Sequence, residues 1–391
     1  MLPEFFEFCN PTKIIYGVGI ASDLKTQLDN IEGKRYFIVA DKIIYKLGLV
    51  KKVTDGIKAA GYDIAGEFLD IPPDSEIKAV KACAEKAKET NADGFISIGG
   101  GSVIDTAKVA NILYSNGGDL AKYYSGVNIL TKPLKTSIVI PTTSGTGSEV
   151  TTVATIYDEK NKVKLAFTDK FLRPNLAVLD PEMTITMSPK ITAITAMDAL
   201  THSIEAYVGI NASPISDIFA SSAVNLIFQN LIAAAEDGNN IEARGNMLIA
   251  STLAGIAFNH SMVGCVHSMA HAAGGLYNVP HGVANGIFLP HGLEYNFEYI
   301  KDKLICLAHY IGLDVATMSI AEGARKVIQE IRHLTKKLNE LGTLDIRLRD
   351  VGVPEDGLLS IAKAAVKDVT SFFNPREIVA EEILINIKNA Y

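Results

Sequence analysis

The chain has 391 residues, enough for two ordinary domains with substantial cores, and its 48% hydrophobic and 21% charged composition is typical of a globular protein. A net charge of −7 leaves no excess of Lys and Arg for a nucleic-acid partner, and no basic amphipathic arm indicates a membrane surface. We see no signal-peptide pattern, and the longest nearly apolar stretch, residues 247–258, is too short to span a bilayer. Four cysteines without paired spacing predict reduced thiols in a cytoplasmic protein.

Short β-branched runs alternate with helical patterns between residues 35 and 180. The runs at 35–41 (RYFIVAD), 94–98 (GFISI) and 136–140 (TSIVI) are continuously apolar, which is typical of strands buried on both faces. This alternation predicts right-handed βαβ units and a parallel sheet. After Asp180-Pro181 the strand signals end and helical patterns continue to the C-terminus. We therefore expect an α/β domain over residues 1–185 and an all-helical domain over residues 186–391.

Lysine and arginine are unusually sparse in part of the predicted helical domain. Between residues 191 and 300 the only Lys or Arg is Arg244, yet the segment holds six of the chain's eight histidines. A water-facing helix normally carries several basic residues, so most of this segment must be enclosed. Buried ionisable groups are costly unless they are paired or bound to a metal, so the polar residues here need an explanation.

Two loops follow predicted strands and are rich in glycine or hydroxyl groups. Gly99, Gly100, Gly101 and Ser102 open a helix, whose free N–H groups could bind a pyrophosphate, although a tight turn explains the glycines equally well. Residues 141–148 (PTTSGTGS) offer five hydroxyls, or are simply a Ser/Thr-rich turn. Because both loops lie at the carboxyl ends of parallel strands, together they favour a nucleotide site.

Asp41 ends the first buried strand. Its carboxylate could accept hydrogen bonds from an adenosine ribose and repel a 2′-phosphate. It could equally be the N-cap of the next helix.

Acidic and histidine residues recur at helical spacing in the second half. Asp198, His202 and Glu205 share one side of a predicted helix, and His267 and His271 share a face four residues apart. His281 follows in a Gly/Pro-rich turn. Surface ion pairs and core histidines are the ordinary explanations, but the lack of Lys and Arg nearby favours a divalent metal, Fe(II) or Zn(II), over Ca(II) or Mg(II).

These motifs resemble the iron-containing (group III) alcohol dehydrogenases, relatives of lactaldehyde reductase and 1,3-propanediol dehydrogenase, over nearly the whole chain. The matching segments are GGGSVIDTAK (99–108), PTTSGTGSEVT (141–151), MDALTHSIEAYV (197–208) and FNHSMVGCVHSMAHAAGGLYNVPHGVANGIFLPH (258–291). The resemblance implies metal ligands at Asp198, His202, His267 and His281, a non-ligand active-site histidine at His271 and a substrate-pocket aromatic at Phe258. It places dinucleotide contacts at Asp41, Gly99, Gly100, Gly101, Ser102, Thr142, Thr143, Thr146 and Lys164.

The implied enzyme is a metal-dependent, NAD(P)-linked alcohol dehydrogenase with its active site between the two domains. It would interconvert small primary alcohols or diols and aldehydes or ketones by hydride transfer, use NAD in preference to NADP, and form a homodimer or larger homo-oligomer. One departure is at residues 72–75 (PPDS), where many relatives carry an Asn that contacts the cofactor, so that contact is not transferred.

Two alternatives remain. A lyase-like enzyme related to dehydroquinate synthase shares this architecture, but its phosphorylated acidic substrate would require many basic residues, which residues 191–300 lack. A nucleotide-binding module without catalysis is disfavoured by the complete Asp/His quartet.

Overall fold

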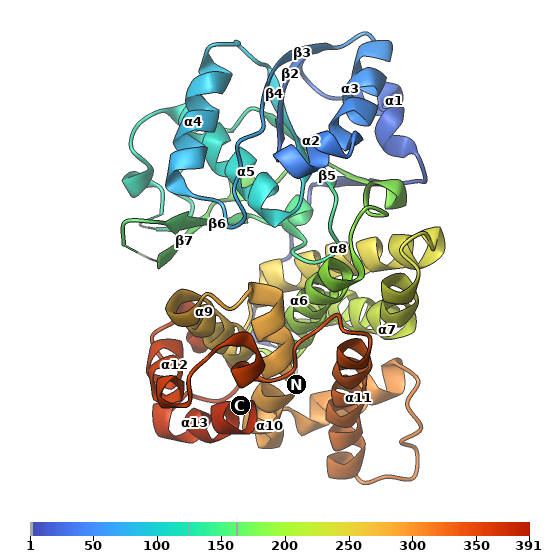
Figure 1. Ribbon diagram of the computed structural model, residues 1–391, viewed down its shortest axis with the longest axis vertical. Coiled ribbons are helices and arrows are strands. Elements are labelled where there is room, and N and C mark those ends of the chain that lie inside the picture. Colours follow the sequence, from blue (N-terminus) through green and yellow to red (C-terminus); the bar gives the residue numbers. More distant parts are fainter. Residues whose placement is uncertain (1–2, 125, 162) are drawn as a thin grey trace. The chain divides into compact units, whose positions relative to one another are not determined.

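The computed structural model describes residues 3–124, 126–161 and 163–391 (Figure 1). Contacts divide the chain into two compact units, one comprising residues 10–186 and the other residues 187–391 together with the N-terminal segment that ends at Cys9. The first unit is built on a parallel sheet, and the second contains helices without a strand in residues 187–391. The predicted fold class, an α/β part followed by a helical part, is confirmed.

The α/β unit contains a six-stranded sheet in the order β1-β8-β5-β4-β2-β3, and all five pairings are parallel. Alternate residues of β2 explain its unbroken apolar run. Phe37 and Val39 join one apolar core, whereas Tyr36 and Ile38 join the core on the opposite face. The strands are β1 (Lys13–Tyr16), β2 (Arg35–Ala40), β3 (Asp63–Phe68), β4 (Gly94–Gly99), β5 (Thr136–Pro141) and β8 (Leu176–Leu179).

Helices cover both faces of this sheet (Figure 1). The core that contains Phe37 is closed by α4 and α5, and the core that contains Tyr36 is closed by α1 to α3. An antiparallel hairpin, which the sequence patterns did not predict, packs its first strand against α5. The bounds are α1 (Lys25–Leu28), α2 (Lys42–Lys46), α3 (Leu49–Ala59), α4 (Ile77–Lys88), α5 (Gly101–Asn116), β6 (Val153–Asp158) and β7 (Val163–Thr168).

The helical unit is organised around α6, which contacts α7, α8, α9 and α10. Ser188 caps α6 by accepting a hydrogen bond from Ile191 N, and Pro189 occupies its first turn, where a missing N–H is harmless. The helices are α6 (Pro189–Val208), α7 (Pro214–Glu236), α8 (Ile241–Ser261), α9 (Cys265–Tyr277), α10 (His281–Tyr310), α11 (Ile320–Glu340), α12 (Leu358–Ala365) and α13 (Ala380–Asn389).

Arg244, the only basic residue between 191 and 300, is itself fully buried. Its guanidinium donates to Thr192 Oγ1 at 2.6 Å and to the carbonyl oxygens of Gly238 and Met187 at 3.0 and 3.1 Å. A buried cation with three acceptors ties the start of α6 to α8. It is therefore not positioned to neutralise the acidic groups farther along α6.

The N-terminal segment packs on the helical unit. The Phe8 ring stacks 4.3 Å from the His260 ring and 5.6 Å from Phe219, and His260 Nε2 lies 3.1 Å from the carbonyl oxygen of Cys9. Among the four free cysteines, Cys83 and Cys265 are buried, whereas Cys9 and Cys306 are exposed.

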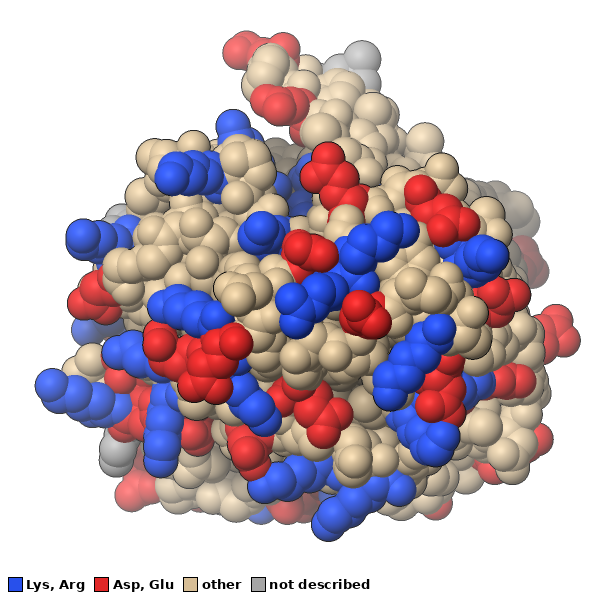
Figure 2. Space-filling model, turned by 90° about the horizontal axis from the view of Figure 1, so that it is seen from above, with Lys and Arg blue, Asp and Glu red and all other residues tan. Residues whose placement is uncertain are grey.

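Helix α7 is long and apolar enough to cross a membrane by length and composition, and 44% of its most apolar window is buried. It packs on α6 and α8, and Ala223, Val224 and Ile227 belong to the core of the helical unit. A core helix of this kind is weak evidence for a membrane span. Figure 2 shows a face of the molecule on which Lys and Arg side chains are interspersed with Asp and Glu.

Candidate metal centre and nucleotide loops

Helix α6 presents the first two of the predicted metal ligands. Asp198 and His202 lie one turn apart, both are buried, and His202 Nδ1 is 3.9 Å from Asp198 Oδ2. Burial raises the pKa of Asp198, but electrostatic interactions with the neighbouring histidines and the hydrogen bond from Asn285 outweigh it, so the pKa lies below its usual value. The carboxylate is therefore ionised although it is buried.

Helix α9 adds His267, which is held by a buried acid on α6. His267 Nδ1 donates to Glu205 Oε2 at 2.5 Å, and Val266 N donates to Glu205 Oε1 at 2.7 Å. Burial raises the pKa of Glu205 to about 7, although backbone donors from Gly264, Val266 and His267 oppose the shift. Burial also lowers the pKa of His267 well below its usual value. A neutral imidazole with Nδ1 occupied leaves Nε2 as its ligand atom.

His281 begins α10, directly after the Pro280 N-cap. The next residue must be small, because a Cβ on Gly282 would clash with the carbonyl oxygen of Ile194 on α6. This close approach brings the start of α10 against the helix that carries Asp198. His281 Nε2 lies 3.4 Å from Asp198 Oδ1.

The four side chains converge. One potential ligand atom from each of Asp198, His202, His267 and His281 lies within 4.8 Å of the others. His202 Nδ1 is buried and has no hydrogen-bond partner among the described residues. One carboxylate and three imidazoles suit a first-row divalent metal, and an orphaned ring nitrogen is what removal of a cation leaves. The residues present therefore fit a metal ion.

Asn285, which the sequence did not single out, lies at the centre of this group. Its Nδ2 donates to Asp198 Oδ1 at 2.7 Å and lies 3.3 Å from His267 Nε2 and 3.2 Å from His281 Nε2. An amide nitrogen carries only two protons and cannot satisfy three acceptors. The only sequence signal was its position four residues after His281 on one helix.

His271 and Phe258 flank the quartet. His271 Nδ1 donates to Asp368 Oδ2 at 2.9 Å, and its ring stacks 5.3 Å from that of His281. The half-buried Phe258 ring stacks 4.4 Å from His202. Asp368, which the sequence analysis missed, stands 97 residues after His271. Burial raises the pKa of Asp368, but hydrogen bonds from His271 and Thr370 bring it below its usual value.

In the α/β unit, the two predicted nucleotide loops lie against each other. A Cβ on Gly101 would meet Thr146 Cγ2 at 2.7 Å, and a Cβ on Gly100 would meet the Thr143 side chain at 3.1 Å. Gly100 provides no side-chain cap for α5. Val103 N and Ile104 N donate to Gly100 O at 3.0 and 3.1 Å, which leaves the N–H groups earlier in the turn, including that of Ser102, to bind a ligand. The two loops thus form one polar surface at the carboxyl edge of β4 and β5.

One hydroxyl in this surface points to a ligand. Thr142 Oγ1 is buried without a hydrogen-bond partner among the described residues, and Thr142 N donates to Gly99 O at 3.0 Å. Behind the loop, Ser148 Oγ donates to Asp105 Oδ1 at 2.7 Å, which fixes the end of the loop to α5. The residues therefore fit a phosphate- or ribose-bearing cofactor.

Asp41 and Lys164 occupy two further predicted contact positions. Asp41 caps α2, because Oδ1 accepts from Ile43 N at 2.8 Å and Ile44 N at 2.9 Å. The N-cap explanation is therefore correct, and Oδ2 takes no part in these bonds. Lys164, on β7, donates to Asp74 Oδ1 at 3.0 Å.

Comparison with known proteins identifies the family. The profile "Iron-containing alcohol dehydrogenase" matches residues 11–181, and "Fe-containing alcohol dehydrogenase family, C-terminal" matches residues 192–391. The NAD-dependent methanol dehydrogenase of Bacillus methanolicus is 36% identical over 98% of this chain and 99% of its own. The 1,3-propanediol dehydrogenase of Klebsiella pneumoniae is 34% identical over 99% of both chains.

A solved structure of 1,3-propanediol oxidoreductase superposes with a TM-score of 0.95 and 34% identity, covering 99% of this chain and 100% of its own. Nothing in these comparisons favours the lyase alternative. Both halves match one family, and the matched ranges contain the Asp/His quartet and the two loops. The chain therefore belongs to the iron-containing alcohol dehydrogenase family.

Proposed function

We propose that this alcohol dehydrogenase binds one catalytic divalent metal through Asp198, His202, His267 and His281. The observation that carries the proposal is the convergence of four ligand atoms within 4.8 Å of one another. The ionised state of Asp198 and the neutral state of His267 support it, because metal ligands must be deprotonated.

The proposed resident metal is Fe²⁺, with Zn²⁺ as the alternative. Both ions accept imidazole and carboxylate ligands. Catalytic zinc usually keeps three protein ligands and one open position, so a set of four favours iron, which readily takes a fifth. The family name of both matched profiles supports the same choice.

The proposed cofactor is NAD(H) rather than NADP(H). Its pyrophosphate would lie on Gly99, Gly100, Gly101 and Ser102, with further contacts from Thr142, Thr143, Thr146 and Lys164. The uncapped start of α5 and the orphaned Thr142 hydroxyl support this assignment. Asp41 would oppose a 2′-phosphate by charge repulsion. The relative from Bacillus methanolicus carries "NAD-dependent" in its name.

The site residues have separate tasks in the proposed mechanism. When bound, the metal supplies Lewis acidity toward the alcohol or carbonyl oxygen, and the nicotinamide supplies hydride chemistry. Glu205 keeps the His267 ring oriented. Asp368 keeps the Nδ1 proton of His271 in place, so that His271 Nε2 is available to hold or pass on a proton. Phe258 limits the space beside His202.

The proposed substrates are small primary alcohols or diols and the corresponding aldehydes or ketones. The names of the two relatives specify methanol and 1,3-propanediol. A cytoplasmic homo-oligomer, a dimer or larger, completes the proposal, and the four free cysteines support a reducing compartment.

An anaerobic screen tests this function. The enzyme is stripped of metal, reconstituted separately with Fe²⁺ and Zn²⁺, and assayed with NAD across methanol, ethanol, longer primary alcohols and 1,2- and 1,3-diols. We expect metal-dependent turnover that is highest on short alcohols or diols and higher with Fe²⁺. Equal turnover in the stripped and reconstituted enzyme would refute the proposal.

A further inference from the structure

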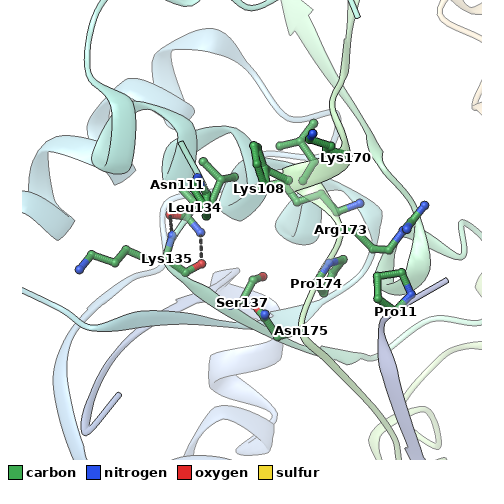
Figure 3. A pocket seen from close by; sticks show the side chains of 13 residues that line it. Pro11, Lys108, Asn111, Leu134, Lys135, Ser137, Lys170, Arg173, Pro174 and Asn175 are labelled. Carbon is green, nitrogen blue, oxygen red and sulfur yellow. Dashed lines mark hydrogen bonds between the residues drawn. The ribbon is translucent and has the colours of Figure 1, made fainter. Parts of the chain in front are cut away.

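A polar cavity lies in the α/β unit, at the edge of the sheet opposite the nucleotide loops. This amino-edge pocket, of about 230 Å³, is enclosed by α5, by residues 133–137 at the start of β5 and by residues 170–175 before β8 (Figure 3). Ser137, the second residue of β5, lines it, whereas Thr142 follows the last residue of the same strand. At ~3.3 Å per residue, five residues separate the two sites by roughly 16 Å.

The lining of the amino-edge pocket is cationic. Lys108, Lys135, Lys170 and Arg173 line it, and the lining residues include no Asp or Glu. Figure 3 shows Lys108, Lys170 and Arg173 on one side of the pocket, whereas the Lys135 side chain extends away.

The Lys108 ammonium group is already hydrogen-bonded to three acceptors within the protein. This buried group donates to the carbonyl oxygens of Thr151 and Val153, each at 2.9 Å, and to Thr151 Oγ1 at 3.0 Å. It therefore contributes charge to the pocket but no free donor. Burial lowers the pKa of Lys108 to about 8; Asp105 and Glu149 act against this shift, and Arg173 adds to it.

Lys170 and Arg173 are the cations that remain available. Neither forms an ion pair with a carboxylate in the described part of the chain, and Lys170 Nζ lies over the Phe171 ring at 5.1 Å. Arg173 Nε is buried and has no hydrogen-bond partner among the residues that the structure describes. Buried donors are almost always satisfied, so this one indicates a missing acceptor.

We propose that the amino-edge pocket binds a small phosphate-class oxyanion, either free phosphate or the phosphate group of a small metabolite. Arg173 donates through its planar guanidinium, which matches phosphate geometry, and Lys170 supplies a second charged donor. The carboxamide of Asn175 and the hydroxyl of Ser137 offer neutral polar groups in the same lining. A dianion suits the site better than a monoanion, because two positively charged side chains, Lys170 and Arg173, are available to it.

This site differs in kind from the nucleotide loops. Those loops would bind phosphate through the N-terminus of α5, whereas Lys108 and Asn111 line the amino-edge pocket from the middle and second half of the same helix. The helix dipole acts mainly within the terminal turns, so affinity in this pocket must come from side chains. Substitution of two side chains should therefore weaken binding without affecting the nucleotide loops.

Isothermal titration calorimetry with inorganic phosphate tests the proposal on the metal-loaded enzyme saturated with NADH, which keeps phosphate off the nucleotide loops. The test variant is Lys170→Gln with Arg173→Gln. The control is Lys58→Gln with Lys81→Gln, which removes the same charge from exposed positions on α3 and α4. We expect saturable one-to-one binding in the wild type and the control, and affinity at least about tenfold weaker in the test variant.

Two further ligands define the chemistry. Acetate should bind more weakly than phosphate. If glycerol 3-phosphate binds more tightly than phosphate, the natural ligand is a metabolite's phosphate group; if it binds more weakly, the ligand is the free ion. Turnover and thermal midpoint should be unchanged in the test variant, which shows that it is folded. Absence of saturable phosphate binding in the wild type, or an equal loss of phosphate affinity in the test and control variants, would overturn the proposal.

Discussion

His267 Nδ1 lies 2.5 Å from Glu205 Oε2, and both side chains are almost fully buried. This bond fixes the imidazole in the tautomer that leaves Nε2 unprotonated, on the side where Asp198 and His281 converge. Residues that orient a ligating histidine typically change metal affinity about 10–100-fold when they are replaced.

Replacement of Glu205 should therefore weaken metal binding without removing a ligand. We expect Glu205→Leu to lower affinity by about 10–100-fold, and Glu205→Gln to retain most of it, because the amide oxygen still accepts from Nδ1. Metal content after dialysis against graded chelator measures the difference. Wild-type retention in Glu205→Leu would show that the bond has no such role.

Asp41 should set the preference for NAD over NADP. Asp41→Asn removes the charge but keeps an oxygen that can cap α2. Asp41→Gly removes both the charge and the capping oxygen, and the lost cap should lower stability by only about a few tenths of a kcal/mol. Both variants should shift the ratio of kcat/KM toward NADP. A wild type that favours NADP, or a ratio unchanged in both variants, would rule out this role.

His271 should act on the substrate rather than bind the metal. His271→Ala should retain metal, and its turnover should fall by about 10²–10⁴-fold. Turnover should fall less in Asp368→Ala, because the His271 imidazole remains but is no longer oriented. His309→Ala, at an exposed position of α10, is the control. Loss of metal in His271→Ala would contradict the assignment.

His291 should make the fold sensitive to acid. Burial lowers its pKa from 6.5 to about 4, so between these values the unfolded chain binds more protons and stability falls as pH falls. From pH 7 to 5 this group should remove about 2 kcal/mol of unfolding free energy. Denaturant titrations at pH 7 and 5 should show that loss in the wild type and in the exposed control His333→Gln, but not in His291→Leu. The same change of unfolding free energy with pH in all three proteins would refute the prediction.

The parts of the site that residue patterns alone could predict share one property: they depend on local geometry. Asp198 and His202 are one helical turn apart, so helical periodicity alone places them together. The loops after β4 and β5 meet because neighbouring parallel strands end at one edge of the sheet. His267 and His281 needed the family resemblance, since nothing local fixes how α9 and α10 approach α6.

Other features could not be predicted, because they depend on packing between distant segments. Asp368 reaches His271 across 97 residues, and Phe8 packs on His260 across most of the chain. The β6–β7 hairpin has no tight-turn signal such as Asn-Gly between its strands, and its exposed face mixes polar and apolar residues. Asn285 resembles any other amide on a buried helix until three ligand atoms surround it.

The most direct test of the central claim is metal content and anomalous scattering for Ala variants of Asp198, His202, His267 and His281. His260→Ala and His291→Ala are matched controls, because both histidines lie in the same unit but outside the quartet. Each quartet variant should lose metal and activity and have a less stable helical unit, since its remaining ligands stay buried and unpaired. The controls should keep stoichiometric metal. Stoichiometric metal in the quartet variants, or an anomalous peak away from these four residues, would contradict the account.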